Sequence, residues 1–298
     1  MVVDNVTKKF ANCLALDNVS VNLYSGECLC LIGPNGSGKS TLIRAICQRI
    51  TVDKGKIYFT GKVNKRIGWI PQEIAVYPTL SVLENLNYFA SISDVPVSKQ
   101  KEEVNQSLLI CALQNRANDK VNNLSVGMKR RLNFAIGLLN NPDIILMDEP
   151  TSGVDPENRN KIWSLIAELK SKGSTILLTT QNLEEVEQIC DRVAIINNGR
   201  IVEQGELNAL TERVIGRFWT VSIDARKSVD SEINNNKVRI REKITSVENE
   251  LPCIIDGIKH QGWLIDGIRV LPPNIHSVYF ELTDQQQNKE SFDEYKPL

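Results

Sequence analysis

The segment from residue 33 to residue 40 carries the most specific chemical pattern in the sequence. It reads Gly-Pro-Asn-Gly-Ser-Gly-Lys-Ser and fits the spacing G-x-x-x-x-G-K-[ST]. Glycines in such a loop let backbone N–H groups turn around phosphate oxygens, the lysine reaches the β- and γ-phosphates, and the last serine holds Mg²⁺. A plain glycine turn needs neither the lysine nor this spacing, so the sequence predicts a nucleotide-binding loop. The predicted contacts are Gly33, Pro34, Asn35, Gly36, Ser37, Gly38, Lys39, Ser40 and Thr41.

Two adjacent carboxylates, Asp148 and Glu149, follow the apolar run from Ile144 to Met147. Acidic residues at the carboxyl end of a parallel strand fall in the crevice where α/β sheets bind ligands. Asp148 suits Mg²⁺, directly or through water, and Glu149 suits polarising an attacking water. A strand that ends in Asp-Glu more often leads into a solvated loop. The presence of the phosphate loop favours the catalytic interpretation.

The segments that must position these residues follow an α/β order. Residues 2–7 and 19–23 are strand-like, and residues 27–32 form an almost wholly apolar strand that leads into the glycine loop and a helix near Lys39. The stretch from about Ser81 to Leu139 has a helical pattern and predicts an insert. Further expected elements are strands at 143–147, 175–179 and 193–196, a helix at 158–170 and a tight hairpin turn at 197–200.

The sequence changes character beyond about Arg217, where we place a domain boundary. Polar runs near 230–243 suggest a solvated surface, and short strand-like pieces follow. The segment 255–259, Ile-Asp-Gly-Ile-Lys, recurs at 265–269 as Ile-Asp-Gly-Ile-Arg, which fits either two duplicated strands or chance similarity. From Gln285 the polar tail is expected to be mobile.

Composition excludes several classes of protein. The chain has 298 residues, of which 35 are Lys or Arg and 36 are Asp or Glu, so its net charge of −1 supplies no field for nucleic acid. Its apolar runs are shorter than the roughly 18 residues that a transmembrane helix needs, so we expect that the chain does not cross a membrane by itself. The first residues lack the pattern of a signal peptide, so we expect a cytosolic location. The seven cysteines form no C-x-x-C pair and are expected to be reduced core residues.

A family can be named from the segment Leu124-Ser125-Val126-Gly127-Met128, followed by Lys-Arg-Arg. The chain resembles the nucleotide-binding subunits of ABC transporters, particularly those of drug, antibiotic, lipid or polysaccharide exporters. Leu124, Ser125 and Gly127 match the LSGGQ-type signature of that family. Three further residues match in order: Phe10 at the adenine-stacking position, Gln72 in the Q-loop and Asp155 in the D-loop. Taken alone, Phe10 fits a core aromatic, Gln72 a surface amide and Ser125 a helix N-cap.

The resemblance covers about residues 1–216 and implies a P-loop NTPase core with a parallel sheet, an antiparallel β subdomain and a helical insert at about 74–140. Residues 217–298 would form a small C-terminal α+β appendage, either structural or regulatory. In this family two subunits clamp ATP and Mg²⁺ between the phosphate loop of one and the signature of the other. We therefore expect a homodimer that docks on a separate membrane permease at the inner face of the cell membrane, with Gln72 near both the metal and the attacking water.

Two departures from the family pattern bear on activity. Gln181 stands where the family has a histidine that contacts the γ-phosphate, and Val126 replaces the first glycine of the signature pair. Glutamine donates a hydrogen bond but carries no charge, so we expect slow hydrolysis. The alternative function is a regulatory ATP-dependent clamp. Cassettes that act on ribosomes or DNA, and small-molecule kinases, fit this single compact cassette less well.

Overall fold

The computed structural model describes residues 1–11, 13–60, 66–227 and 237–284. The chain divides into two compact units, Met1–Gly205 and Glu206–Leu298. The second unit thus begins before the boundary expected near Arg217, because helix α7 (Leu207–Val214) packs against α9 (Ile275–Asp284) within that unit. The mobile tail expected from Gln285 lies outside the described residues.

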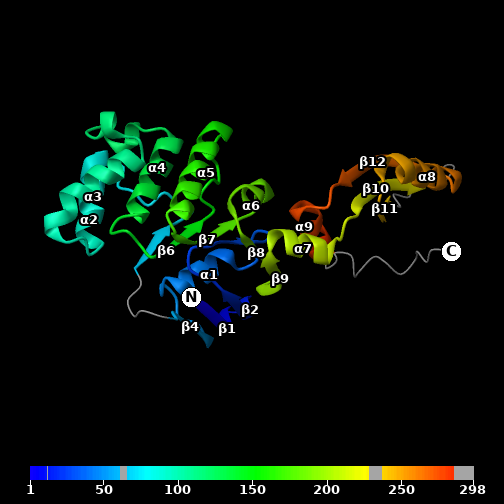
Figure 1. Cartoon of the computed structure of the whole chain (residues 1–298), viewed down its shortest axis with the longest axis horizontal. Helices are drawn as coiled ribbons and strands as arrows, with labels where there is room; N and C mark the ends of the chain where they lie inside the picture. The colour runs from blue at the N-terminus through cyan, green and yellow to red at the C-terminus, as the bar shows by residue number, and fades with distance from the viewer. Residues whose placement is uncertain (12, 61–65, 228–236, 285–298) are drawn as a thin grey trace. The chain divides into compact units, whose positions relative to one another are not determined.

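A six-stranded sheet forms the centre of the first unit, in the order β5-β6-β7-β3-β8-β9. Figure 1 labels β6, β7, β8 and β9 of this sheet. The pairs from β5 to β8 in this order are parallel. Strands β3, β6 and β7 are buried along their whole length, as expected for strands covered on both faces. The strands are β3 (Cys28–Ile32), β5 (Ile67–Ile70), β6 (Ile144–Asp148), β7 (Thr175–Thr180), β8 (Arg192–Asn197) and β9 (Arg200–Glu206).

The turn between β8 and β9 is the hairpin predicted from Asn-Gly. Asn198 has φ +47° and Gly199 has φ +76°. A type I′ turn requires positive φ at both central residues, and asparagine and glycine adopt it at least cost. This prediction is confirmed.

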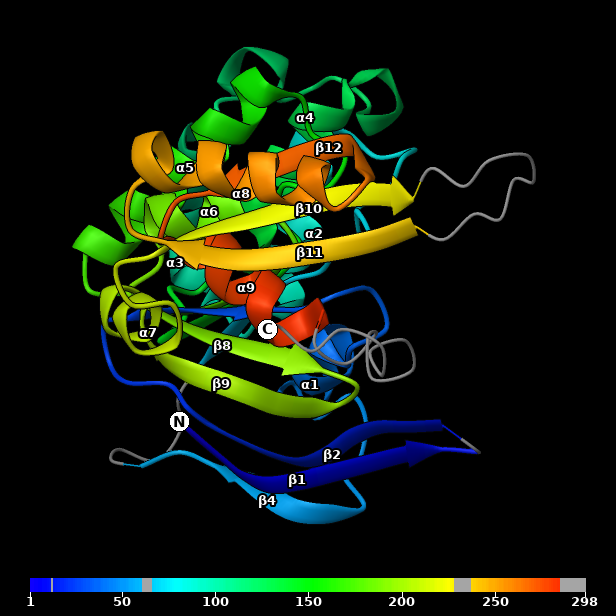
Figure 2. The same cartoon turned by 90° about the vertical axis from the view of Figure 1, so that its right-hand side faces the viewer.

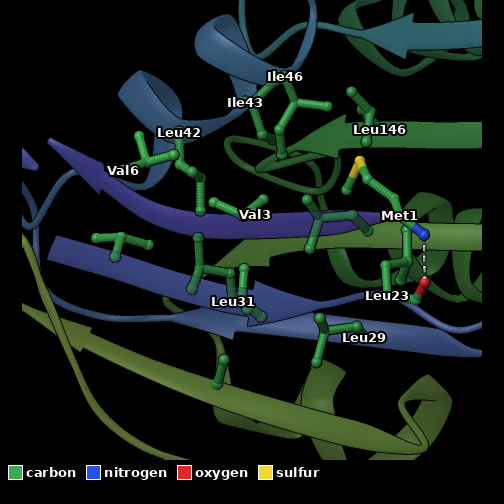
Figure 3. Close-up of a cluster of buried hydrophobic side chains, with 14 of the residues drawn as sticks. Met1, Val3, Val6, Leu23, Leu29, Leu31, Leu42, Ile43, Ile46 and Leu146 are labelled. Carbon is green, nitrogen blue, oxygen red and sulfur yellow. Dashed lines mark hydrogen bonds between the residues drawn. The ribbon is translucent and has the colours of Figure 1, made fainter. Parts of the chain in front are cut away.

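A second, three-stranded antiparallel sheet contains β1 (Val2–Phe10), β2 (Cys13–Asn22) and β4 (Lys54–Tyr58) in the order β2-β1-β4. Its apolar face packs with β3 and with α1 (Lys39–Ile46) in one buried cluster. Val3 and Val6 of β1 meet Leu31 of β3 and Leu42 of α1 there (Figure 3). This cluster fixes the strand and the helix that flank the phosphate loop.

The helical insert has its own core. Val82, Leu86, Val104 and Leu132 are buried in it together. Ser81 begins the first helix with a capping box, in which its hydroxyl accepts from the Glu84 N–H and the Glu84 carboxylate accepts from the Ser81 N–H. The helices here are α2 (Val82–Ile92), α3 (Val97–Ile110) and α4 (Val126–Gly137), with short 3₁₀ turns η1 (Gln114–Arg116) and η2 (Val121–Asn123). Two more helices, α5 (Pro156–Ser171) and α6 (Leu183–Ile189), flank β7 in the sequence.

The second unit contains a three-stranded antiparallel sheet in the order β11-β10-β12. Helix α8 covers one face of it, as Figure 2 shows, and contributes Ile258 to the buried cluster. The repeated segment is therefore not two duplicated strands, since 255–259 is helical and 265–269 lies in a strand. The elements are β10 (Trp219–Lys227), β11 (Lys237–Ile244), α8 (Val247–His260) and β12 (Trp263–Leu271).

The fold class predicted from the sequence is confirmed, with specific differences. Strands β4 and β5 were not anticipated. Cys13 and Cys253 are exposed, so the expectation of core cysteines is wrong for these two, whereas Cys28, Cys30 and Cys111 are buried. In the described part of the chain, no helix is both long enough and apolar enough to cross a bilayer.

Candidate nucleotide-binding site

The phosphate loop connects β3 to α1, and its glycines are required by its surroundings. A Cβ atom on Gly33 would lie 2.1 Å from the Ile196 carbonyl oxygen. Gly38 has φ +109°, and a Cβ there would lie 2.6 Å from the Ala15 carbonyl oxygen. The Ser37 hydroxyl is buried and has no hydrogen-bond partner among the described residues. The loop is therefore closely packed at Gly33 and Gly38, where a side chain would collide with backbone carbonyl oxygens.

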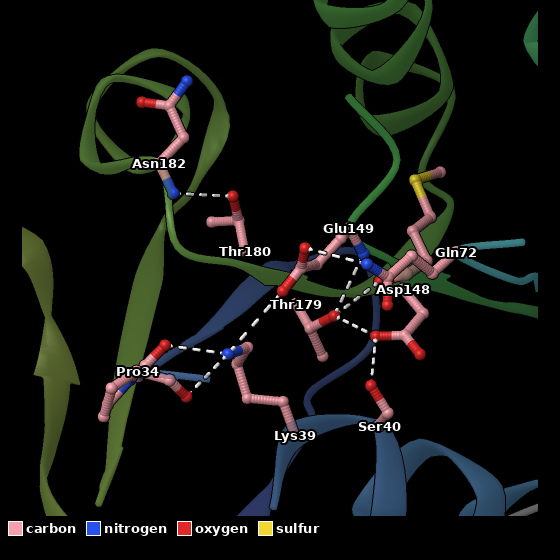
Figure 4. Close-up of polar contacts among 11 residues, drawn as sticks. Pro34, Lys39, Ser40, Gln72, Asp148, Glu149, Thr179, Thr180 and Asn182 are labelled. Atoms are coloured by element: carbon pink, nitrogen blue, oxygen red, sulfur yellow. Dashed lines mark hydrogen bonds and ion pairs between the residues drawn. The ribbon is translucent and has the colours of Figure 1, made fainter. Parts of the chain in front are cut away.

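Lys39 places a buried ammonium group inside this loop (Figure 4). Its Nζ donates to the carbonyl oxygens of Gly33 at 2.8 Å and Pro34 at 3.1 Å. It also lies 3.7 Å from Glu149 Oε1. Burial lowers the pKa of Lys39, while the charges of Glu149 and Asp148 act in the opposite direction. A buried cation with these partners fits an anionic ligand such as a nucleotide phosphate.

The Ser40 hydroxyl of α1 and the Asp148 carboxylate at the end of β6 lie together and could act as hard oxygen ligands. The Ser40 hydroxyl donates to Asp148 Oδ1 at 3.1 Å, and the Thr179 hydroxyl donates to the same oxygen at 2.6 Å. Adjacent ligands of an octahedral Mg²⁺, each about 2.1 Å from the metal, lie about 3.0 Å apart. The spacing of the two oxygens therefore fits Mg²⁺, with Thr179 orienting the carboxylate.

Glu149 is held in an unusual backbone conformation beside these groups. Its φ is +45°, in the left-handed region that non-glycine residues adopt at a cost of roughly 1–3 kcal/mol. Its N–H donates to both the carbonyl oxygen of Thr179 at 3.0 Å and the Thr179 hydroxyl at 3.1 Å. Gln72 Nε2 donates to Glu149 Oε2 at 3.3 Å. The structure thus brings Lys39, Asp148, Gln72 and Glu149 together, as the sequence predicted for a site.

The signature and D-loop residues lie at the starts of two neighbouring helices. Ser125 caps α4, where its hydroxyl accepts from the Met128 N–H at 3.3 Å, so the N-cap interpretation is confirmed. Asp155 caps α5 and accepts from the N–H of Asn158 at 3.0 Å and from its Nδ2 at 2.8 Å. A Cβ on Gly127 would lie 2.9 Å from the Asn158 side chain. Asn158 therefore connects the signature helix to the D-loop.

Three predicted residues lie apart from these contacts. Phe10 ends β1, its side chain is 45% exposed, and the Lys8 ammonium lies 5.2 Å from its ring centroid. This exposure excludes a core role for Phe10. Gln181 follows β7 and is exposed, and Val126, the first residue of α4, is 59% exposed.

Sequence reasoning missed several buried polar residues around the site. Thr179 contacts Asp148 and the Glu149 N–H, and Arg130 is only 4% exposed. Glu185 is fully buried and accepts hydrogen bonds from the Thr151 hydroxyl and Trp163 Nε1, both at 3.0 Å. Thr179 stands in a largely apolar strand, which was the available signal for it, since buried polar groups usually have partners. Arg130 and Glu185 lie in charged stretches of α4 and α6, where the sequence does not mark them as buried.

Burial raises the pKa of Glu185, against the lowering effect of hydrogen bonds from Thr180, Trp163 and Thr151. Above the ordinary pKa of 4.5, an unfolded chain loses this proton while the folded chain retains it. The stability that Glu185 contributes is therefore complete below pH 4.5 and declines as the pH rises through the raised folded-state pKa. Glutamine does not titrate, so we expect Glu185→Gln to lack this loss of stability. The free energy of unfolding of the variant minus that of wild type should therefore increase as the pH rises.

Urea unfolding of both chains from pH 4.5 to pH 8 checks this expectation, since the range begins at the ordinary glutamate pKa. Glu187→Gln, an exposed position on the same helix, serves as the control. A difference between Glu185→Gln and wild type that stays constant with pH would contradict it.

Comparison with known proteins agrees with this geometry. Residues 16–152 match the family model described as ABC transporter. The chain is 37% identical to the linearmycin resistance ATP-binding protein LnrL of Bacillus subtilis, over 94% of this chain and 97% of the relative. It is 36% identical to the Nod factor export ATP-binding protein I of Cupriavidus metallidurans, over 95% and 96% of the two chains.

Solved structures agree with the sequence relatives. The structure aligns with a dimeric ATP-binding cassette in a post-hydrolysis state bound to ADP and Pi, with a TM-score of 0.62, 27% identity, and coverage of 69% of this chain and 97% of the other. It also aligns with a nucleotide-free ATP-binding cassette of an ABC transporter, with a TM-score of 0.61, 30% identity, and coverage of 69% and 92%. Since two sequence relatives match nearly the whole chain, it belongs to the ABC transporter family as an ATP-binding subunit.

Proposed function

We propose that this chain is the ATP-hydrolysing subunit of an ABC exporter, in which MgATP closes a dimer of two copies and hydrolysis lets it reopen. The observation that carries the proposal is the cluster of Lys39, Ser40, Gln72, Asp148 and Glu149, whose members are linked by contacts of 2.8–3.7 Å to the phosphate loop or to each other. These are the groups that phosphoryl transfer to water requires.

Each group has a role that follows from its position. Lys39 would exchange its bonds to backbone carbonyls for bonds to the β- and γ-phosphates. Ser40 and Asp148, with Gln72, would hold Mg²⁺, which neutralises charge on the phosphates when bound. The Glu149 carboxylate, supported by Gln72, would accept a hydrogen bond from the attacking water and orient it. Phe10 would stack on adenine through its exposed ring.

The signature residues support the dimer part of the proposal. Ser125 and Gly127 lie at the start of α4, where the first backbone N–H groups and the helix dipole favour an anion. In a head-to-tail dimer they would contact the γ-phosphate bound to the partner, with Asp155 beside them. The γ-phosphate would then favour the closed state because it binds both copies.

Export is supported by the names of the relatives. The Nod factor proteins are named for export and LnrL for resistance to linearmycin, and both are ATP-binding proteins. We infer that a separate permease carries the substrate, and that this subunit docks on it at the inner face of the membrane through the surface near Gln72 and the helical insert.

Steady-state hydrolysis of ATP by the purified full chain, with and without Mg²⁺, tests the proposal. The molar mass should be followed in the same samples by light scattering. Mg²⁺-dependent turnover with ATP-dependent dimers is expected. Dimers that form with ATP but show no turnover, alone or with a permease, would instead favour a regulatory clamp, the alternative that Val126 and Gln181 support.

Gln181→His is expected to raise kcat about tenfold, since a histidine at this position can carry positive charge near the γ-phosphate. Glutamine supplies positioning without charge. The gain is expected to stay below the roughly 10²–10⁴-fold of a complete acid–base group, because glutamine can already donate a hydrogen bond there. Comparing kcat of Gln181→His with that of Gln188→His, an exposed position on α6, measures the effect. Turnover in Gln181→His equal to or lower than that of wild type would show that the lack of a histidine at residue 181 does not limit hydrolysis.

A further inference from the structure

Arg130 is a buried cation that the proposed roles leave unused. It lies on α4, five residues after the signature serine Ser125, and is 4% exposed. Burial lowers the pKa of Arg130, and the charge of Glu149 acts in the opposite direction. Burying a guanidinium costs free energy unless its N–H groups form hydrogen bonds and an opposite charge lies nearby.

The guanidinium connects two loops through backbone carbonyls. Its NH1 group donates to the carbonyl oxygen of Gln72 at 2.5 Å and of Pro71 at 3.3 Å. Its NH2 group donates to the carbonyl oxygen of Ser152 at 3.1 Å. The planar fork of arginine can bond both loops at once, whereas a lysine ammonium at the end of a flexible chain has no such fixed geometry.

Both of these loops touch Glu149. Gln72 donates its side-chain amide to Glu149 Oε2, and the Ser152 N–H donates to the Glu149 carbonyl oxygen at 3.1 Å. Arg130 therefore holds the two neighbours that contact the side chain and the backbone of Glu149. A displacement of Arg130 would therefore change the position of the Glu149 carboxylate through Gln72 and through Ser152.

Helix α4 anchors the Gln72 loop at a second point on the same face. Asn133, three residues after Arg130, donates from Nδ2 to the Pro71 carbonyl oxygen at 3.3 Å and accepts from the Ala75 N–H at 3.1 Å. Residues three apart on a helix lie on one face. This face of α4 is thus hydrogen-bonded to the segment 71–75, and Ser125 lies at the start of the same helix.

We propose that Arg130 is a positioning residue for hydrolysis, which couples the position of the signature helix α4 to Glu149 through the carbonyls of Gln72 and Ser152. The inference rests on the proposed ATPase function. It predicts that movement of Ser125, when it meets a nucleotide on a partner subunit, changes the alignment of Glu149 in the same chain.

The test compares Arg130→Ala and Arg130→Lys with Lys129→Ala. Lys129 is the adjacent basic residue, and its Nζ donates to the Asn122 carbonyl oxygen at 3.4 Å. For each full-length variant we would measure kcat and KM for ATP with Mg²⁺, and repeat the Arg130→Ala assay with millimolar ethylguanidinium. Thermal unfolding of each variant gives its stability.

In Arg130→Ala and Arg130→Lys, kcat is expected to fall at least about tenfold, because misplacement of a reacting group by about 1 Å costs up to 10²-fold, while KM changes by less than about threefold. Ethylguanidinium is expected to restore part of the kcat of Arg130→Ala only. Should Arg130→Ala fail to fold, Arg130→Lys, which keeps the charge, carries the kcat measurement.

Two results would overturn this inference while leaving the proposed function intact: wild-type kcat in both Arg130 variants, or a lower kcat that follows stability and is not rescued. A wild-type chain without Mg²⁺-dependent hydrolysis would refute the proposed function, and this inference with it. Loss of activity in Lys129→Ala equal to that in Arg130→Ala would also count against a specific role for Arg130.

Discussion

Replacement of Glu149 by glutamine is expected to lower kcat for ATP about 10²–10⁴-fold, the range that general acid–base groups contribute. Glutamine keeps the size of the side chain and its contact with Gln72, but it cannot accept a proton or attract the water as a carboxylate does. The variant should still bind MgATP, because Lys39, Ser40 and Asp148 are unchanged. Its dimers should therefore form with ATP and persist.

Steady-state hydrolysis and light scattering on the same samples measure both effects. Glu168→Gln is the matched control, since Glu168 is an exposed glutamate on α5 whose Oε1 lies 2.6 Å from the Lys172 ammonium. We expect the control to hydrolyse ATP at the wild-type rate. Undiminished hydrolysis in Glu149→Gln would show that another group orients the water.

Lys39→Met is expected to weaken binding of MgATP about 30-fold or more, since removing one partner of a buried charge pair costs roughly 2–5 kcal/mol. The Lys39 ammonium is buried among the loop carbonyls, so the phosphates would lose a desolvated charge partner. Methionine fills a similar volume without donating. Binding and not only turnover should therefore be lost.

Isothermal titration calorimetry with Mg²⁺ and the non-hydrolysable analogue AMP-PNP measures this affinity without turnover. Lys172→Met, which removes an exposed ammonium from an ion pair of 2.6 Å, is the control and should bind as wild type does. If Lys39→Met binds the nucleotide with wild-type affinity, the Lys39 ammonium of the wild-type chain does not contact the phosphates and instead stays bound to Glu149 and the loop carbonyls.

The central site could be predicted from sequence because its residues are consecutive or follow recognisable strands. Gly33 and Lys39 belong to one motif, and Asp148 and Glu149 follow an apolar strand whose carboxyl end had to meet that motif in a parallel sheet. Local spacing and the rule for ligand sites in α/β sheets were enough. The resemblance added Gln72, whose contact with Glu149 the structure contains.

The residues that support the site could not be predicted in this way. Thr179 acts through its hydroxyl on Asp148, 31 positions away in sequence, and Arg130 bonds carbonyls 58 and 22 positions away. Such contacts depend on the register between β6 and β7 and on the packing of α4, which no local pattern encodes. Backbone carbonyls as partners also leave no trace in residue types.

The second unit was the least predictable part of the chain. The polar run near 230–243 suggested a solvated surface, but residues 237–244 form strand β11, in which Val238, Ile240 and Ile244 stand among charged residues. The pattern Ile-Asp-Gly-Ile occurs once in a helix and once in a strand, because the surrounding tertiary contacts override weak local preference. Strand β5, with four residues, was too short to show periodicity.

Because Glu149 has a left-handed backbone conformation, the residues that favour folding at position 149 differ from the residue that favours ATP turnover. Glycine or asparagine would adopt this conformation with less strain, so a population selected only for folded protein should drift toward them. A population selected for transport should retain glutamate despite the strain. In a library that varies residue 149, the variants enriched by abundance and by activity should therefore be different ones.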